Sequence, residues 1–125
     1  MLTVLYDSSC ALCRKARSWL QDQPKYVEME FVPADSLEAR RLFPDLDHAS
    51  TLRDLTVIGS GGELYRGAKA WVMCLWALRE YRETALKLST PEAMPAARRL
   101  IAWVSRNRLW LSSAMESVGF QRRTS

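Results

Sequence analysis

Two cysteines mark the point at which a short apolar segment of the chain passes into an amphipathic helix. The apolar segment is Leu2–Tyr6, and directly after it comes Asp7-Ser8-Ser9-Cys10-Ala11-Leu12-Cys13. At the N-terminus of the helix, unpaired backbone N–H groups and the positive end of the helix dipole favour the thiolate form of Cys10. Cys13 lies one helical turn on, on the same side of the helix, and is close enough to form a disulfide with Cys10. The chain therefore has the pattern of a dithiol redox protein.

The length and composition of the chain bound its size and class. Its 125 residues are enough to bury a core without disulfides, and their mixture of apolar and charged types is typical of a soluble globular protein. The sequence contains no linker, repeat or low-complexity tract that would divide it. We therefore expect one thioredoxin-like domain over residues 1–125, with a core at about 1–84 and a helical extension at about 90–120.

The cysteines and the apolar runs of the sequence indicate a cytoplasmic protein. Three cysteines are an odd number and too few for the disulfide framework of a small secreted domain. Met1–Tyr6 has no basic region and its apolar run ends at Asp7, so we expect no signal peptide. No apolar stretch approaches the roughly 20 residues that span a bilayer, so we expect no transmembrane segment. In the cytoplasm, a Cys-x-x-Cys pair is more often catalytic or metal-binding than structural.

Hydrophobic periodicity and turn residues divide the rest of the chain into helices and strands. In order, the expected elements are a strand at 2–6, a helix at 10–21, a strand at 27–32, a short helix at 35–43, a hairpin of strands at 55–58 and 63–66, a helix at 68–81 and a helical tail. The residues expected to start, turn or end these elements are Pro24, Asp35 with Glu38, Gly61-Gly62, Thr90-Pro91, Ser113 with Glu116, and Gly119. This β-α-β-α-β-β-α order predicts an α/β fold, a thioredoxin-like three-layer sandwich with an added C-terminal helical tail.

Three segments of the sequence resemble a known protein family. The first is Tyr6-Asp7-Ser8-Ser9-Cys10-Ala11-Leu12-Cys13, which resembles the signature of the DCC family of thiol-disulfide oxidoreductases, small thioredoxin-like proteins named for an Asp-x-x-Cys-x-x-Cys motif. The others are Tyr65-Arg66-Gly67-Ala68-Lys69-Ala70 and Ala102-Trp103-Val104-Ser105-Arg106-Asn107-Arg108, the latter similar to the Asn-Arg-containing C-terminal helix of that family. The resemblance covers nearly the whole chain and implies an oxidoreductase with a redox-active disulfide.

The environment expected for each thiol assigns it a role in a protein-disulfide reductase. Cys10, in the first helical turn, is expected to be the more exposed thiol and to attack a substrate disulfide, with Arg14 adding positive potential nearby. Cys13 borders apolar residues of the helix, so it is expected to be more buried and to resolve the mixed disulfide. The same steps in reverse oxidise a dithiol, and the sequence leaves the direction open.

Asp7 has two possible roles in such a site. It can accept the proton of Cys13 during resolution, which requires a partly desolvated carboxylate with a raised pKa. Alternatively, it is a turn residue whose carboxylate accepts nearby backbone N–H groups, with Ser9 as the N-cap of the helix. The sequence favours neither interpretation over the other.

One segment departs from the thioredoxin pattern. Thioredoxins usually place a cis-proline before the third core strand, opposite the disulfide, where it helps to receive the substrate backbone. The segment at that place in this chain, Ala49-Ser50-Thr51-Leu52-Arg53-Asp54, contains no proline. The expected substrate is therefore a disulfide-containing protein that docks specifically by another route, or a small thiol, with an electron donor that the sequence does not identify.

Cys74 and His48 are weaker candidates for chemistry. Cys74 lies on the apolar stripe of its helix, which favours a small buried hydrophobe over a third redox or metal-binding residue. His48, the single histidine, lies in a polar loop and is expected at the surface, although it could approach the cysteine pair. A closed zinc site needs four ligands, and the cysteine pair would need both of these distant residues to complete one. We therefore expect no metal and no other cofactor.

Tryptophans and arginines in the C-terminal half suggest an alternative, noncatalytic function. Trp76 and Met73 lie off the inward stripe of the helix at 68–81, and we expect the C-terminal helices to cover them. From Arg98 onward, arginines outnumber acidic residues, which indicates a solvated helix face or a contact with an acidic partner or an anionic membrane surface; no nucleic acid is expected. In this alternative, a thioredoxin-like interaction module binds a partner through the Trp-rich helix and the basic tail.

Overall fold

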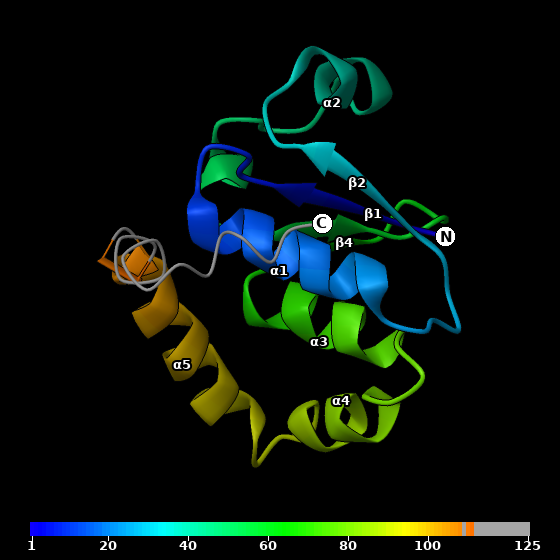
Figure 1. Cartoon of the computed structure of the whole chain (residues 1–125), viewed down its shortest axis with the longest axis vertical. Helices are drawn as coiled ribbons and strands as arrows, with labels where there is room; N and C mark the ends of the chain where they lie inside the picture. The colour runs from blue at the N-terminus through cyan, green and yellow to red at the C-terminus, as the bar shows by residue number, and fades with distance from the viewer. Residues whose placement is uncertain (109, 112–125) are drawn as a thin grey trace.

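The protein is built from one mixed sheet with helices on both of its faces. A computed structural model describes residues 1–108 and 110–111 of the chain, and Figure 1 shows the elements in chain order. The strands are β1 (Leu2–Tyr6), β2 (Met29–Pro33), β3 (Thr56–Ile58) and β4 (Leu64–Arg66). The helices are α1 (Ala11–Asp22), α2 (Leu37–Leu42), α3 (Ala68–Trp76), α4 (Arg82–Leu88) and α5 (Met94–Arg106), with a short 3-10 helix, η1 (Ser50–Leu52), before β3.

The strands of the sheet follow the order β2-β1-β3-β4. β1 pairs in parallel with β2, where Val4 is opposite Phe31, and antiparallel with β3, where Val4 is opposite Val57. β3 and β4 form an antiparallel hairpin. Because α1 connects the two parallel strands, the chain begins with a βαβ unit, and the cysteine segment lies between the carboxyl end of β1 and the start of α1.

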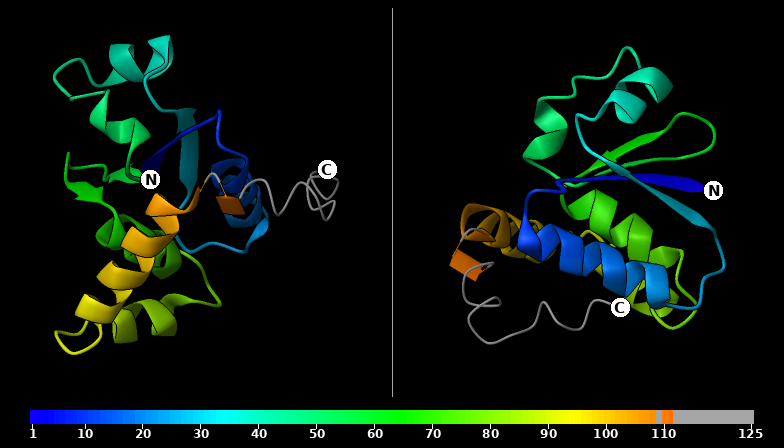
Figure 2. Two further views of the ribbon diagram at one scale, coloured as in Figure 1. Left: turned by 90° about the vertical axis from the view of Figure 1, so that its left-hand side faces the viewer. Right: turned by 45° about the horizontal axis from the view of Figure 1, so that its top comes forward.

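Apolar side chains alternate between the two faces of the sheet and form two cores. On one face, Leu2 and Val4 pack with Leu20 of α1 and with residues of α3. On the other face, Leu5 packs with Ala39 of α2. Figure 2 shows the resulting layers, with α2 and η1 on one side of the sheet and α1 and α3 on the other. The prediction of a thioredoxin-like α/β fold is confirmed.

Two elements are shorter than the sequence predicts, and one set of hydrogen bonds explains both. α3 ends at Trp76 instead of near Tyr81, and β2 begins late, at Met29. The carbonyl of Ala77 accepts the backbone N–H of Tyr26 at 2.8 Å and that of the next residue at 3.3 Å. A carbonyl that is bonded across the molecule does not continue its own helix. Tyr26 and Val27, which precede β2, are therefore bonded to the residue that ends α3 instead of to β1.

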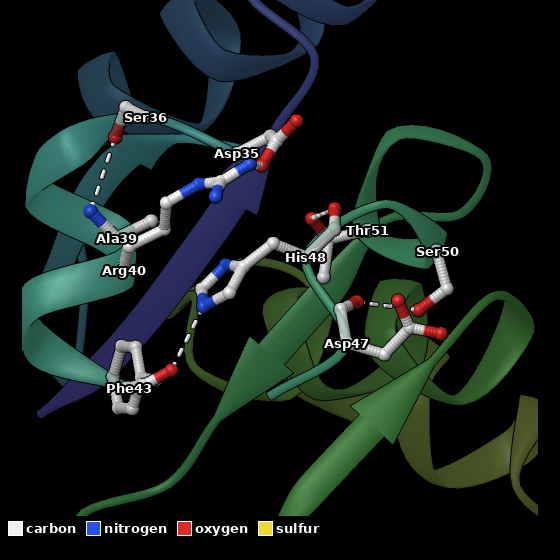
Figure 3. Close-up of polar contacts among 9 residues, drawn as sticks. All are labelled: Asp35, Ser36, Ala39, Arg40, Phe43, Asp47, His48, Ser50 and Thr51. Atoms are coloured by element: carbon white, nitrogen blue, oxygen red, sulfur yellow. Dashed lines mark hydrogen bonds and ion pairs between the residues drawn. The ribbon is translucent and has the colours of Figure 1, made fainter. Parts of the chain in front are cut away.

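The start of α2 differs from the predicted capping box. Ser36, not Asp35, is the N-cap, and its Oγ accepts the backbone N–H of Ala39 at 3.1 Å. Asp35 has a positive φ of 59° and pairs with Arg40. Figure 3 shows that the Asp35 carboxylate lies against the Arg40 side chain while the Ser36 hydroxyl points to the first turn of the helix. The cap is therefore one residue later than expected.

The segment between α2 and β3 is ordered by local hydrogen bonds, where the sequence predicted a loop. His48 is only 8% exposed, in contrast to the predicted surface position, and its Nε2 lies 2.8 Å from the carbonyl oxygen of Phe43 (Figure 3). The Thr51 hydroxyl donates to the His48 carbonyl at 2.7 Å, and the Ser50 hydroxyl donates to the Asp47 carbonyl at 2.8 Å. These bonds hold η1 and the residues before it in a fixed conformation.

The hairpin turns at the predicted glycine pair, but only one of the two glycines needs its conformational freedom. Gly62 has a positive φ of 93°, whereas Gly61 does not. The turn is closed by bonds from the Gly62 N–H to the Gly59 carbonyl at 3.0 Å and from the Gly59 N–H to the Glu63 carbonyl at 2.9 Å. A side chain at Gly62 would be strained by this backbone conformation.

The C-terminal part of the chain contains a helix that the sequence did not indicate. α4 is short, and Ala85 is its one buried residue, so its sequence has no amphipathic period to detect. The sequence predicted that the next helix begins directly after Thr90, but α5 begins later, at Met94. The Thr90 hydroxyl does accept a backbone N–H, that of Ala93 at 3.2 Å, but it does so in a turn that precedes the helix.

Some predictions for the tail are not tested by the structure. The capping pair of Ser113 with Glu116 and the helix end at Gly119 lie outside the described residues. The division into a core and a helical extension stays a prediction. Within the part of the chain that the structure describes, no helix is both long enough and apolar enough to cross a bilayer.

Leu78 provides a test of the core between the sheet and its helices. It is fully buried there, so Leu78→Ala removes its packing and leaves a cavity. We expect the free energy of unfolding to fall by about 2–5 kcal/mol, measured by urea denaturation. The matched control is Leu86→Ala on α4, where the side chain is 54% exposed and the expected change is under about 0.5 kcal/mol. Equal losses in the two variants would contradict the position of Leu78.

Candidate active site

Cys10 is the N-cap of α1. Its φ of −100° and ψ of 121° are extended, and its Sγ accepts the backbone N–H of Cys13 at 3.4 Å. Its carbonyl accepts the N–H of Arg14 at 3.0 Å, the first bond of the helix. The sequence interpretation that made Ser9 the cap is therefore wrong by one residue. The sulfur itself meets the unpaired N–H groups at the positive end of α1.

The exposures of the two thiols are the reverse of the sequence prediction. Cys10, expected to be the more exposed, is 4% exposed, and Cys13 is half-buried. The cap explains the difference, because a side chain that accepts a hydrogen bond from the first turn folds back over the end of the helix. Cys13 instead lies in the wall of a cavity. Both residues are free thiols in this structure.

The thiol of Cys13 is held in its protonated form. Its pKa is raised to about 12 by burial, by the hydrogen bond between its side chain and that of Cys10, and by the negative charge of a Cys10 thiolate. The guanidinium of Arg108 acts in the opposite direction and lowers this pKa, while the carboxylate of Asp7 adds to the increase. This environment favours a pair in which Cys10 carries the negative charge and Cys13 carries the proton.

The carboxylate of Asp7 organises the turn before α1. Its Oδ1 accepts the backbone N–H of Ser9 at 3.0 Å and the Ser9 hydroxyl at 2.7 Å. Its backbone carbonyl accepts the N–H of Cys10 at 3.2 Å. These are the contacts of a turn residue, which was one of the two sequence interpretations. The second oxygen, Oδ2, has a different partner and lies 3.4 Å from Nη2 of Arg108.

Arg108 is the cation that contacts Asp7, although the sequence analysis did not select it as a site residue. Besides its pairing with Asp7, its Nη1 donates to the Leu52 carbonyl at 3.0 Å, so one side chain links the cysteine turn to η1. Figure 1 shows the end of α5 beside the start of α1. Arg14, the cation expected there, donates to the Ser8 carbonyl at 2.9 Å on the exposed side. The Asn-Arg segment of the tail was the signal in the sequence that could have identified Arg108.

A largely apolar cavity of about 190 Å³ lies beside Cys13, between α1, η1 and the end of α5. Both η1 and the residues that follow it come from the proline-free segment before β3, so this segment and Cys13 line the same cavity. Apolar side chains of α1 and α5 form much of the wall, and polar groups of the site join them. These residues include Leu12, Ala16, Ile101, Val104, Asp7 and Arg108.

Cys74 and His48 lie away from the cysteine pair. Cys74, a residue of α3, is fully buried in the core, as predicted, and burial raises the pKa of its thiol to about 12. His48 bonds to the end of α2 and is not in the wall of the cavity beside Cys13. Among residues 1–108 and 110–111, no group of three or more His, Cys, Asp or Glu side chains is placed to hold a metal ion.

The tryptophans of α3 do not form the exposed surface that the noncatalytic alternative requires. Trp71 and Trp76 are half-buried. The guanidinium of Arg82 lies 4.1 Å from the centre of the Trp76 ring, and its Nε donates to the Trp76 carbonyl at 2.8 Å. The start of α4 thus covers Trp76, where the sequence predicted cover from the helices of the tail. Trp103 and Trp110, at 46% and 66% exposed, lie on or just after α5, and a role for them in binding a partner stays a prediction.

Comparison with known proteins agrees with this geometry. A family model described as DCC1-like thiol-disulfide oxidoreductase matches residues 4–114. No curated protein and no solved structure matches the chain significantly. The matched span contains both cysteines of the pair, and it also contains Asp7 and Arg108, which pair with each other in the wall of the cavity.

Arg108→Met tests whether the link to Asp7 and Leu52 supports the site. The side chains of the ion pair are 28% and 10% exposed, so water screens the interaction only in part. We expect the free energy of unfolding at pH 7 to fall by about 1–3 kcal/mol, measured by urea denaturation. Arg106→Met, which changes an exposed arginine at the end of α5, is the control, with an expected change of about 0.5 kcal/mol or less. A loss in Arg108→Met no larger than in the control would rule out this supporting role.

Proposed function

Because the chain belongs to the DCC1-like thiol-disulfide oxidoreductase family, we propose that Cys10 and Cys13 are its redox-active dithiol and that they reduce disulfide substrates. The observation that carries this proposal is the contact between the two cysteines at the start of α1. The Cys10 sulfur accepts the backbone N–H of Cys13 at 3.4 Å, and the hydrogen bond between the two side chains helps to raise the Cys13 pKa to about 12. One sulfur is thus prepared as a thiolate and the other as its proton-bearing partner.

In the first step, the Cys10 thiolate attacks one sulfur of a substrate disulfide, R–S–S–R′. A bond forms between Cys10 and the R sulfur, the substrate S–S bond breaks, and R′ leaves as a thiolate. The N-terminus of α1 stabilises the negative charge of Cys10 before the attack. Because Cys10 is only 4% exposed, a small substrate reaches its sulfur more readily than the surface of a folded protein does.

In the second step, Cys13 loses its proton and its sulfur attacks the Cys10 sulfur. The Cys10–Cys13 disulfide forms, the bond between Cys10 and the R sulfur breaks, and R leaves as a thiolate that takes up a proton. We assign Asp7 as the proton acceptor, since its carboxylate is near enough to raise the pKa of Cys13. Two molecules of an external thiol then reduce the Cys10–Cys13 disulfide through a second mixed disulfide and leave joined to each other as a disulfide, which completes the cycle.

Trapping with Cys13→Ser tests the order of the two thiols. We expect this variant to accumulate a mixed disulfide on Cys10 when it is mixed with 2-hydroxyethyl disulfide, because serine cannot displace R. Intact-mass spectrometry detects the adduct. Cys10→Ser is expected to form little adduct near neutral pH, because burial, the largest cause of the raised Cys13 pKa, persists in this variant and leaves little thiolate. Equal and slow modification of both variants would contradict the proposal and favour the noncatalytic interaction module.

Asp7→Asn tests the proton transfer separately from the turn. Asparagine keeps an oxygen that can accept the Ser9 N–H, but it cannot take a proton from Cys13. We expect conversion of the mixed disulfide to the Cys10–Cys13 disulfide to slow by about 100-fold, followed by acid quenching and mass spectrometry. Asp22→Asn, at the exposed end of α1, is the matched control and should behave as wild type. A wild-type rate in Asp7→Asn would leave Asp7 with the turn role alone.

A further inference from the structure

We propose that the cavity beside Cys13 binds one aromatic ring or short branched alkyl group of a small disulfide substrate that also carries a carboxylate. The inference rests on the proposed function, because it names the group R that is attached to Cys10 in the mixed disulfide. It concerns a different part of the protein, however. The cavity lies between α1, η1 and the end of α5, and Cys13 forms part of its wall.

The position of the cavity suits the mixed disulfide. Cys10 and Cys13 are hydrogen-bonded to each other, so a group R on the Cys10 sulfur is within reach of the cavity that Cys13 faces. Ala16 and Leu20 continue the same wall along α1, and Ile101 faces them from α5. An apolar group placed there is removed from water while its sulfur stays at the cysteine pair. Binding in the cavity and reaction at Cys10 are therefore compatible.

The size of the cavity limits what it can hold. Apolar protein cavities of about 150 Å³ bind benzene, so a cavity of about 190 Å³ has room for one ring or a short branched chain. It is too small for several side chains of a folded substrate. Part of the cavity wall is formed by η1 and the residues after it, the segment that has no proline to receive an extended substrate backbone. Both observations favour a small molecule over a polypeptide.

One wall residue offers a hydrogen-bond donor for a carboxylate. The Nε of Arg17 is buried and has no hydrogen-bond partner among the described residues. Its Nη1 donates to Gln21 at 3.0 Å, and its guanidinium lies 5.4 Å from the centre of the Tyr6 ring, so the side chain is held in place. A buried donor without a partner is unfavourable, and an anionic oxygen is its strongest acceptor. Arg53 and Arg108 also line the cavity, but Arg53 is exposed to solvent and the guanidinium of Arg108 is paired with Asp7, so we assign Arg17 as the anchor.

Two matched disulfides test the apolar part of the inference. The disulfide of 2-mercapto-3-phenylpropanoate has a ring and a carboxylate, and the disulfide of 2-mercaptopropanoate has the carboxylate alone. Each is mixed at low concentration with pre-reduced wild-type protein, and formation of the Cys10–Cys13 disulfide is followed by mass spectrometry. We expect the compound with the ring to react at least about tenfold faster. Equal rates would overturn the cavity assignment and leave the proposed function intact, whereas no reaction with either compound would contradict the proposed function itself.

A filled cavity should abolish this preference. Ala16→Phe places a ring into the cavity from α1, and we expect the two disulfides to react at similar rates with this variant. Ala102→Phe makes the same change at an exposed position of α5 and should keep the tenfold difference, to within about twofold. A preference that persists in a folded Ala16→Phe would overturn the inference.

Binding without redox chemistry provides an independent measurement that does not require Ala16→Phe to fold. We expect phenylacetate, but not acetate, to raise the melting temperature of the reduced wild-type protein, because it fills the cavity and pairs with Arg17. Arg17→Gln should weaken phenylacetate binding by about tenfold in Kd. If phenylacetate fails to stabilise the wild type, or if Arg17→Gln binds it equally well, the ligand class proposed here is wrong.

Discussion

The hydrogen bond with which Cys10 caps α1 determines the properties of both thiols. A helix begins with backbone N–H groups that have no partner within the helix, and here a sulfur accepts one of them. The same geometry places the Cys10 sulfur at the positive end of the helix dipole and folds it back to 4% exposure. It also directs the Cys13 thiol toward that sulfur, which is one cause of its raised pKa. The position that stabilises a negative charge on the Cys10 sulfur therefore also restricts the access of substrates to this sulfur.

Restricted access gives the surrounding residues their importance. Cys10 is only 4% exposed, so in the proposed reaction the cavity beside Cys13 controls which disulfides reach its sulfur. Asp7 and Arg108 both belong to the wall of this cavity, and their ion pair joins the turn before α1 to the segment after α5. The proposed proton acceptor therefore forms part of the proposed substrate site.

The sequence predicts those features that depend on neighbouring residues. The apolar run of β1, the period of α1 and the turn at Gly62 are local, and the structure contains all three. Features that depend on distant partners were missed or misplaced. α3 ends early because the Ala77 carbonyl bonds to Tyr26, and the sequence around neither residue indicates this bond. The exposures of the two cysteines follow from a cap and a cavity wall, which periodicity does not describe.

The same distinction applies to the candidate site. The Cys-x-x-Cys pair and Asp7 stand out in the sequence because they lie together between a strand and a helix. Arg108 does not, since a basic residue in a basic tail has many possible roles. His48 was misplaced for a similar reason: a histidine among polar residues suggests the surface, and only the fold shows that Phe43 and η1 bury it.

The contact between Asp7 and Arg108 joins opposite ends of the described chain, and this has a consequence for biosynthesis. Contacts that close long loops carry a large entropic cost and form late in folding. The βαβ unit with both cysteines leaves the ribosome before α5 and Arg108 do. A nascent chain therefore exposes Cys10 and Cys13 before α5 and Arg108 can complete the wall of the cavity beside them.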